Sequence, residues 1–471
     1  MLKKAFMLVT GNAFASALLL IRNLLVARMV SPEDYGIAAT FAISMSIVEM
    51  ASYLGLQQLI VVDKDGDDPH VQAAMQGFQV FRGVLSFVLL LAISGPYARF
   101  LGIPEVIWAY QVLALVPLMN GLQHFDVHRL KRSMTFMPSV VSTAVPAVVA
   151  VASLWPITWV YDDYRVMLAS LLAQAVVSVV LTHVMARRPY RIAYDPAVIR
   201  KSMVFGWPLL LNGIMLFLVF NGEKLIVGRE LGMAELAIFS MGFTLTLTPT
   251  LVMGSSIQTF FLPQLSAAQD RQDDFQRIGE VTLEAGLVVG ILLVLGALVF
   301  GGPLIHLLLG AKYAGMMAII VPLSVLQAIR SAKTGSSVVA LARKQSGNAI
   351  VSNLFRVGSL PLSWIIAVQT GDILAIIWVG IAAEVLGYIV SLRLVQTRVR
   401  LSLRRLMATN VLTGLTYLTA ILVSQSYHAR PLFHDHLHLV QMVPVVLGIA
   451  ALLLMGGLRQ YLLRRWRARR G

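Results

Sequence analysis

Long apolar stretches alternate with short polar loops along almost the whole chain. Most stretches are about 20 residues long, which is the length a helix needs to cross the hydrocarbon of a bilayer. The pattern predicts an all-α integral membrane protein with about fourteen transmembrane helices and little chain left for a soluble domain. The helices are expected at roughly 5–27, 36–58, 74–97, 105–124, 136–155, 165–186, 202–225, 233–256, 280–302, 314–332, 348–369, 372–394, 407–425 and 439–461.

Composition agrees with this pattern. Of the 471 residues, 58% are hydrophobic and 13% are charged, and the mean hydropathy is +0.77. A soluble chain of this length would carry about a quarter charged residues, so an ordinary soluble enzyme and a disordered protein are both excluded. The sequence has no cysteine, which excludes disulfides, thiolate metal sites and iron–sulfur clusters.

The motifs predict no cofactor and no metal. The sequence has no glycine-rich phosphate-binding motif of the kind found in ATP-hydrolysing proteins. Alternating histidines in the last outer loop resemble a metal-binding tract, but we interpret them as solvated side chains: His428, His434, His436 and His438.

The net charge of +15 is explained by membrane topology. If Lys3 and Lys4 are cytoplasmic, the loops on their side hold about four times as many Lys and Arg residues as the loops on the other side. This bias predicts a multi-pass protein with an even number of helices and with both termini in the cytoplasm. Contact with anionic membrane lipid is a secondary expectation, and no nucleic-acid partner is expected.

The sequence repeats itself with an offset of about 200 residues. Segment 26–37 resembles segment 227–238, with Val, Arg, an acidic residue and Ile recurring in register, and segment 116–118 is echoed at 321–323. An offset of six helices preserves orientation, so we predict parallel repeats related by an axis along the membrane normal, as in transporters whose two lobes rock about a central site. A duplicated scaffold without a transport role is the alternative.

The repeat also predicts the domain organisation. We expect an N-terminal six-helix lobe over 1–200, a C-terminal six-helix lobe over 201–398, and two additional helices with a basic cytoplasmic tail over 399–471.

Three segments resemble a known family, the Wzx-type polysaccharide transporters of the multidrug/oligosaccharidyl-lipid/polysaccharide exporter superfamily. The run RNLLVARMVSPEDYG at 22–36 is similar to the end of the family's first helix and its first outer loop. The run EKLIVGRELG at 223–232 is similar to the matching segment at helix seven, and FFLPQLS at 260–266 to the cytoplasmic end of helix eight. Glu223 stands where many relatives have Asp, which keeps the charge.

The resemblance implies a secondary transporter rather than an enzyme. It implies a monomeric flippase that moves a polyprenyl-diphosphate-linked oligosaccharide across the bacterial inner membrane during O-antigen, capsule or exopolysaccharide biosynthesis. Polysaccharide polymerase and export machinery are the protein partners it suggests. In this family helices one, two, seven and eight line a cavity between the lobes.

Ionisable residues inside the predicted helices are the candidate functional groups, because a charge at the bilayer centre costs about 2.5–3.5 kcal/mol on insertion scales. Arg22 and Glu223 stand out because they occupy equivalent positions of the two repeats. Gly11 and Arg22 project from one helical face, as do their counterparts Asn212 and Glu223, so a polar face is kept in both repeats.

We assign roles by chemistry. An Arg fork and a Lys point charge both suit a diphosphate, so Arg22, Lys224 and Arg356 are the candidate diphosphate ligands. Buried ion pairs that hold helices together are the alternative interpretation of these charges. The candidate glycan-binding residues are three amides, Asn12, Asn23 and Asn212. Three carboxylates are candidates for gating or for coupling to a proton or sodium ion: Glu49, Glu223 and Glu384.

Two other functions fit the same broad pattern. A drug or organic-cation exporter of the same superfamily would favour cavity carboxylates without cavity Arg or Lys. A membrane glycan polymerase or ligase would need a large outer loop with acid–base residues, whereas the predicted outer loops are short.

Overall fold

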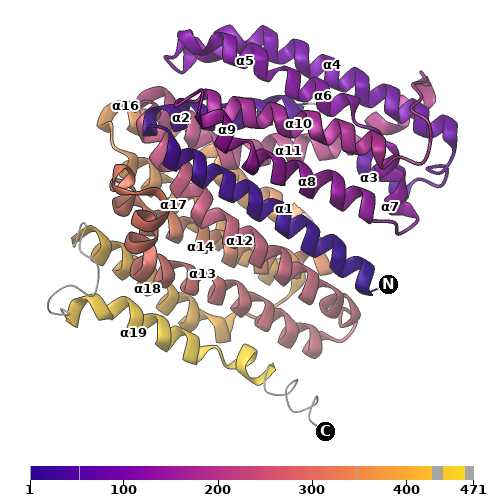
Figure 1. Ribbon diagram of the computed structural model, residues 1–471. Coiled ribbons are helices and arrows are strands. Elements are labelled where there is room, and N and C mark those ends of the chain that lie inside the picture. The colour runs from indigo at the N-terminus through magenta and orange to yellow at the C-terminus, as the bar shows by residue number, and fades with distance from the viewer. Residues whose placement is uncertain (1, 52–53, 346, 427–438, 462–471) are drawn as a thin grey trace. The chain divides into compact units, whose positions relative to one another are not determined.

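The computed structural model describes residues 2–51, 54–345, 347–426 and 439–461, and every regular element in these ranges is helical (Figure 1). The all-α prediction is therefore confirmed. The histidine tract at 428–438 lies outside these ranges. Unit 1 is one compact part of the chain, Met1–Asn221 with Gly232–Ala237, and unit 2 is the other, Gly222–Leu231 with Ile238–Gly471.

Unit 1 is built around three packed helix pairs. Helix α8 packs against both α1 and α10, and α4 packs along α6. Its elements are α1 (Leu2–Met29), α2 (Pro32–Ala51), α3 (Leu56–Val62), α4 (Pro69–Phe100), η1 (Pro104–Val106), α5 (Ile107–Leu113), α6 (Leu115–Leu122), α7 (Asp126–Arg132), α8 (Met137–Ala152), α9 (Leu154–Thr158), α10 (Arg165–Val184) and most of α11 (Pro196–Glu230).

Unit 2 is centred on α14, which packs against α13 and α17, while α15 and α16 pack on α17. Its elements are the end of α11, most of α12 (Met233–Ala267), α13 (Gln272–Leu309), η2 (Ala311–Tyr313), α14 (Met316–Ala342), α15 (Gly347–Gly358), α16 (Leu360–Thr370), α17 (Ile373–Leu394), η3 (Val395–Val399), η4 (Arg404–Leu406), α18 (Met407–Ser426) and α19 (Leu439–Leu454).

Twelve helices in the described ranges are long and apolar enough to cross a membrane. The difference from about fourteen comes from α2 and from the short helix α19. Helix α2 carries Glu33, Asp34 and Glu49 within its 20 residues, and α19 has 16 residues. The chain is a multi-pass membrane protein.

Of the predicted helices that the structure divides, two have a clear local cause for the break. The stretch predicted at 36–58 becomes α2 and α3, and Gly55, which precedes α3, adopts the left-handed conformation with φ of 62°. The stretch predicted at 348–369 becomes α15 and α16, and Pro361 lies in the first turn of α16, where its missing N–H is tolerated.

One boundary matters for the functional site. The helix predicted at 314–332 continues to Ala342 as α14, so Arg330 and Lys333 lie within a membrane helix rather than in a basic inner loop. The prediction was wrong here because hydropathy assigns a helix end to the first charged residues.

A polar network ties the loops of unit 1 together. The side chain of Asp126 is fully buried and accepts hydrogen bonds from Arg129 Nε at 2.6 Å and from the backbone N–H of Arg187 at 2.8 Å. Burial alone would raise the pKa of Asp126, but these hydrogen bonds and the charge of Arg129 hold it below its usual value. Burial also lowers the pKa of His128 to about 3, with a smaller contribution from Lys131, so His128 is neutral.

Candidate functional site

The centre of unit 2 contains a buried group of charged side chains around Glu384 of α17. The carboxylate is fully buried and accepts a hydrogen bond from Arg330 Nη2 at 2.8 Å and another from Lys333 Nζ at 2.8 Å. Arg356 Nε of α15 lies 3.7 Å from the same carboxylate. One carboxylate thus holds three cations from two other helices.

Glu223 supplies the second carboxylate of this group. Glu223 is on α11, and its Oε2 forms an ion pair with Arg356 Nη2. Both side chains are almost fully buried, with exposed fractions of 4% and 1%. Arg356 therefore joins α11 to α17 through two carboxylates.

A glycine of α17 leaves the space that this arrangement needs. A Cβ atom on Gly380 would lie 2.4 Å from Arg356 Nη1 and 2.6 Å from Glu223 Oε1, which is closer than nonbonded atoms approach. Any side chain at position 380 would therefore displace the Arg356–Glu223 pair.

Lys224 adds a further cation beside the group. Its Nζ lies 4.8 Å from the ring centroid of Phe243 on α12, and Arg330 Cζ lies 5.9 Å from the same ring. Such contacts hold a cation over the negative face of the ring without neutralising it. Among the described residues, Lys224 forms no ion pair.

The group, named the charge cluster here, consists of Glu223, Lys224, Arg330, Lys333, Arg356 and Glu384. Four cations face two carboxylates in the described structure, so the charge cluster has a net charge of +2. A site of this kind attracts an anion with two negative charges more strongly than a cation.

Arg330 and Lys333 were missed as site residues by sequence reasoning. The spacing of polar residues could have shown that the helix continues past Arg330. Polar side chains lie three or four residues apart, on one helical face, at Gln327, Arg330, Ser331 and Thr334. Gln327 Oε1 accepts from Arg330 Nη1 at 3.0 Å, and Asn353 Oδ1 of α15 accepts from Lys333 Nζ at 2.9 Å.

In unit 1, Arg22 is held by amides. Its Nη1 donates to Gln174 Oε1 of α10 at 2.7 Å, and its Nη2 donates to Asn23 Oδ1 at 3.4 Å. The structure thus brings Asn23 to Arg22, whereas Asn12 and Asn212 have exposed side chains. Each of the two predicted diphosphate ligands in unit 2, Lys224 and Arg356, belongs to the charge cluster.

Glu49 lines a polar cavity of about 270 Å³ in unit 1. Its Oε1 accepts a hydrogen bond from Asn120 Nδ2 at 3.4 Å. The wall also contains Arg82 and amide side chains such as Gln79 and Gln123. The cavity is therefore suited to water and hydroxyl groups, and one carboxylate is exposed to it.

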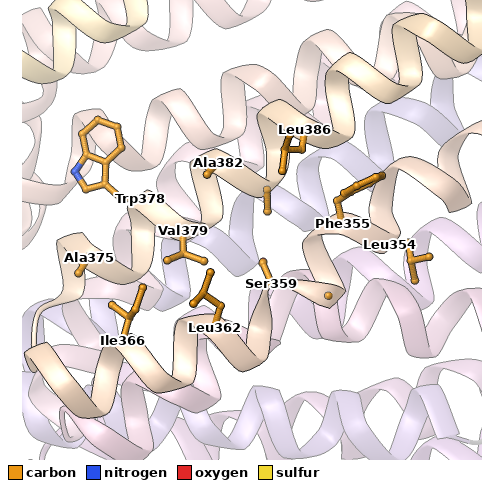
Figure 2. A pocket seen from close by; sticks show the side chains of 12 residues that line it. Leu354, Phe355, Ser359, Leu362, Ile366, Ala375, Trp378, Val379, Ala382 and Leu386 are labelled. Atoms are coloured by element: carbon orange, nitrogen blue, oxygen red, sulfur yellow. The ribbon is translucent and has the colours of Figure 1, made fainter.

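An apolar groove of about 830 Å³ lies between α17 and the broken helix α15–α16 (Figure 2). Leu354 and Leu362 come from the broken helix, and Trp378, Val379 and Leu386 from α17. The groove and the charge cluster lie on neighbouring faces of α17. Val379 and Ala383 line the groove, and the residues that follow them, Gly380 and Glu384, lie at the charge cluster.

The sequence match shows the family to which the chain belongs. Residues 25–318, more than half of the chain, match the family described as polysaccharide biosynthesis protein. The chain belongs to this family. Its members are transport proteins rather than enzymes, which confirms the resemblance to Wzx-like transporters and speaks against a glycan polymerase or ligase.

Two curated relatives have names that agree with this family. The succinoglycan biosynthesis transport protein ExoT of Rhizobium meliloti (strain 1021) is 22% identical over 308 residues, which cover 62% of this chain and 58% of ExoT. The lipopolysaccharide biosynthesis protein WzxC of Escherichia coli (strain K12) is 19% identical over 390 residues, 79% of this chain and 77% of WzxC. The chain thus matches less than two thirds of the length of ExoT.

Solved structures show the fold. The lipid II flippase MurJ in an inward closed conformation superposes with a TM-score of 0.70 at 13% identity, covering 97% of this chain and 99% of MurJ. This likeness shows that the all-helical fold of MurJ extends over nearly the whole chain.

Proposed function

We propose that the protein is a flippase that moves a polyprenyl-diphosphate-linked oligosaccharide across the bacterial inner membrane, for the assembly of a surface or exocellular polysaccharide. The observation that carries the proposal is the charge cluster. A net charge of +2 inside membrane helices costs free energy unless an opposite charge compensates it. A diphosphate diester carries two negative charges and would compensate it.

The apolar groove of unit 2 supports the same substrate class. A polyprenyl chain needs an apolar surface at membrane depth, and the groove offers one beside α17. Lipid tail and diphosphate would then contact neighbouring faces of one helix. Unit 1, taken by itself, has amide side chains suited to hydroxyl groups in the wall of its polar cavity.

In this proposal Glu49 binds and releases the proton or sodium ion that is coupled to transport. Glu384 already faces three cations, which makes it a poor site for a fourth. Glu49 lines the polar cavity of unit 1, whose space for water gives its carboxylate access to an exchanging ion. Both termini lie in the cytoplasm in this proposal, as the distribution of basic residues predicts.

The test uses the full chain in proteoliposomes with a fluorescent polyprenyl-diphosphate-linked oligosaccharide. We expect protein-dependent exposure of the glycan to an impermeant glycosidase, with no transport of the organic cation ethidium. An analogue with the same head group on a short alkyl chain should be moved more slowly because it cannot fill the groove. Transport of ethidium without transport of the lipid-linked glycan would refute the proposal in favour of an organic-cation exporter.

A further inference from the structure

A second groove, of about 720 Å³, lies in unit 1 where α3 meets the first turns of α11. Its apolar side is formed by Leu59, Val204 and Phe205, and its polar side by Arg200 and Lys201. Leu59 belongs to a buried apolar cluster that also contains Val198, and Phe205 packs against that cluster. The floor of the groove is therefore a fixed part of unit 1.

The polar side of the groove has one uncompensated positive charge. Lys201 Nζ forms an ion pair with Asp63 Oδ1 at 2.7 Å, and the Asp63 side chain is only 3% exposed. Arg200 is exposed and forms no ion pair with any residue that the structure describes. Asp195, which precedes α11, pairs with His70 and accepts from the backbone N–H of Ala197, so it is engaged elsewhere.

The surroundings of the groove have the composition of a membrane–water boundary. Val204 and Trp207 of α11 are exposed, at 72% and 59%, and Tyr194 just before the helix is 80% exposed. Exposed aromatic side chains next to basic residues are typical of the head-group level of a bilayer, with the apolar part of the helix continuing into the hydrocarbon. With these aromatic residues at the head-group level, the groove would run from that level toward the acyl chains.

We propose that this groove binds one anionic phospholipid of the surrounding bilayer. Its phosphodiester contacts Arg200, with Lys201 beside it, and one acyl chain lies along Leu59, Val204 and Phe205. The charge distinguishes this ligand from the proposed transport substrate. The groove has a net charge of +1, which matches the single charge of a phosphodiester such as phosphatidylglycerol, whereas a diphosphate would leave one negative charge unpaired.

The experiment measures lipid retention by native mass spectrometry of the purified full chain, after exchange into mixed micelles containing phosphatidylglycerol and phosphatidylcholine. We expect wild-type protein to retain one phosphatidylglycerol and Arg200→Ala to retain it about tenfold less. Arg200 is exposed and unpaired, so its replacement leaves the Lys201–Asp63 pair and the fold intact. Arg191→Ala removes another exposed basic residue close in sequence but outside the groove, and should retain lipid as the wild type does.

A second variant addresses the apolar side. Val204→Glu places a negative charge against the expected acyl chain, one helical turn from Arg200, and should also reduce retention of phosphatidylglycerol. Equal retention in wild type, Arg200→Ala and Val204→Glu would overturn the proposal. Displacement of phosphatidylglycerol from wild type by stoichiometric undecaprenyl diphosphate would overturn it too, because the groove would then prefer the substrate class. No step requires transport, so the outcome is independent of the flippase assay.

Discussion

The two units hold equivalent ionisable residues in different ways. Arg22 in unit 1 is hydrogen-bonded to the neutral amides of Gln174 and Asn23, whereas Glu223, 201 residues later, is paired with Arg356 in unit 2. At these two positions, which the repeat predicted from the sequence makes equivalent, the ionisable groups have opposite charges and different kinds of partner. Glu223 depends on the charge of Arg356 for its burial, whereas Arg22 is held by neutral amides.

This difference predicts where mutations affect folding and where they affect only function. A buried ion pair that loses one partner leaves an uncompensated charge, which is far more destabilising than the loss of both partners. A charge bonded to neutral amides can be replaced by a neutral polar group with little loss. Single charge deletions in the charge cluster should therefore be destabilising, whereas loss of the Arg22 charge should be tolerated.

The largest effect is expected for Glu384→Ala. It leaves Arg330, Lys333 and Arg356 without their shared carboxylate, and should reduce the free energy of unfolding by about 3–5 kcal/mol. Accumulation of the protein in membranes and its melting temperature in detergent measure this loss. Asp273→Ala, at an exposed first-turn position of α13, is the control and should change stability by less than about 1 kcal/mol. Normal accumulation of Glu384→Ala would contradict the mutual dependence of these charges.

The next effect is expected for Gly380→Ala. The added Cβ would overlap Arg356 Nη1 and Glu223 Oε1, so the pair must move apart at a cost of about 1–3 kcal/mol. Gly296→Ala in α13 is the matched control, because a Cβ there meets no neighbouring atom within 4 Å and Ala favours the helix. The melting temperature should fall in the first variant and stay level or rise in the second. Equal melting temperatures would mean that the Arg356–Glu223 contact is loose.

Acid should destabilise unit 1 through His128. The pKa of this side chain in the folded state is about 3, below the value of about 6.5 of an exposed histidine, so the unfolded chain takes up the proton first as the pH falls. Stability should therefore be lost progressively from about pH 6.5 down to about pH 3, with a loss of about 2 kcal/mol at pH 5. Asp126, whose pKa is lowered, loses its contribution only at more acidic pH.

Replacing His128 by Gln provides the check. The dependence of the melting temperature on pH between 7.5 and 5 should become flatter in His128→Gln than in wild type. An unchanged slope would show that another group takes up the proton.

Arg22→Gln should have the smallest effect on folding, below about 1 kcal/mol, because the new amide bonds to Gln174 and no carboxylate loses its partner. Arg356→Gln is the comparison, since it leaves Glu223 unpaired and should lower protein abundance. Similar abundance of the two variants would remove the distinction between the units.

Hydropathy and charge patterns predicted the helical fold and singled out Glu223, Arg356 and Glu384, because ionisable residues are rare in membrane helices. They did not predict which partner each residue takes. In particular, they did not predict that Glu223 pairs with Arg356, 133 residues away. Lys333 was missed because it lies near a helix end in hydropathy, and only packing of α14 against α17 shows that the helix continues past it.

Most residues of the charge cluster cannot be tested for transport without also affecting folding. Arg330, Lys333 and Arg356 are engaged by carboxylates in the structure, so a change in any of them alters folding and function together. Lys224 differs because its contact is with the ring of Phe243. It is the residue of the charge cluster at which transport can be tested without removing an ion pair.

The most direct test of the account is the rate of lipid-linked oligosaccharide flipping by Lys224→Gln in proteoliposomes, normalised to the amount of folded protein. Loss of a cation from the charge cluster should leave protein abundance unchanged and reduce the rate at least about tenfold, because the diphosphate loses a charged contact of roughly 1.4 kcal/mol or more. Lys224→Arg, which keeps the charge, should recover part of the rate. A wild-type rate in Lys224→Gln would contradict the claim that the charge cluster binds the diphosphate.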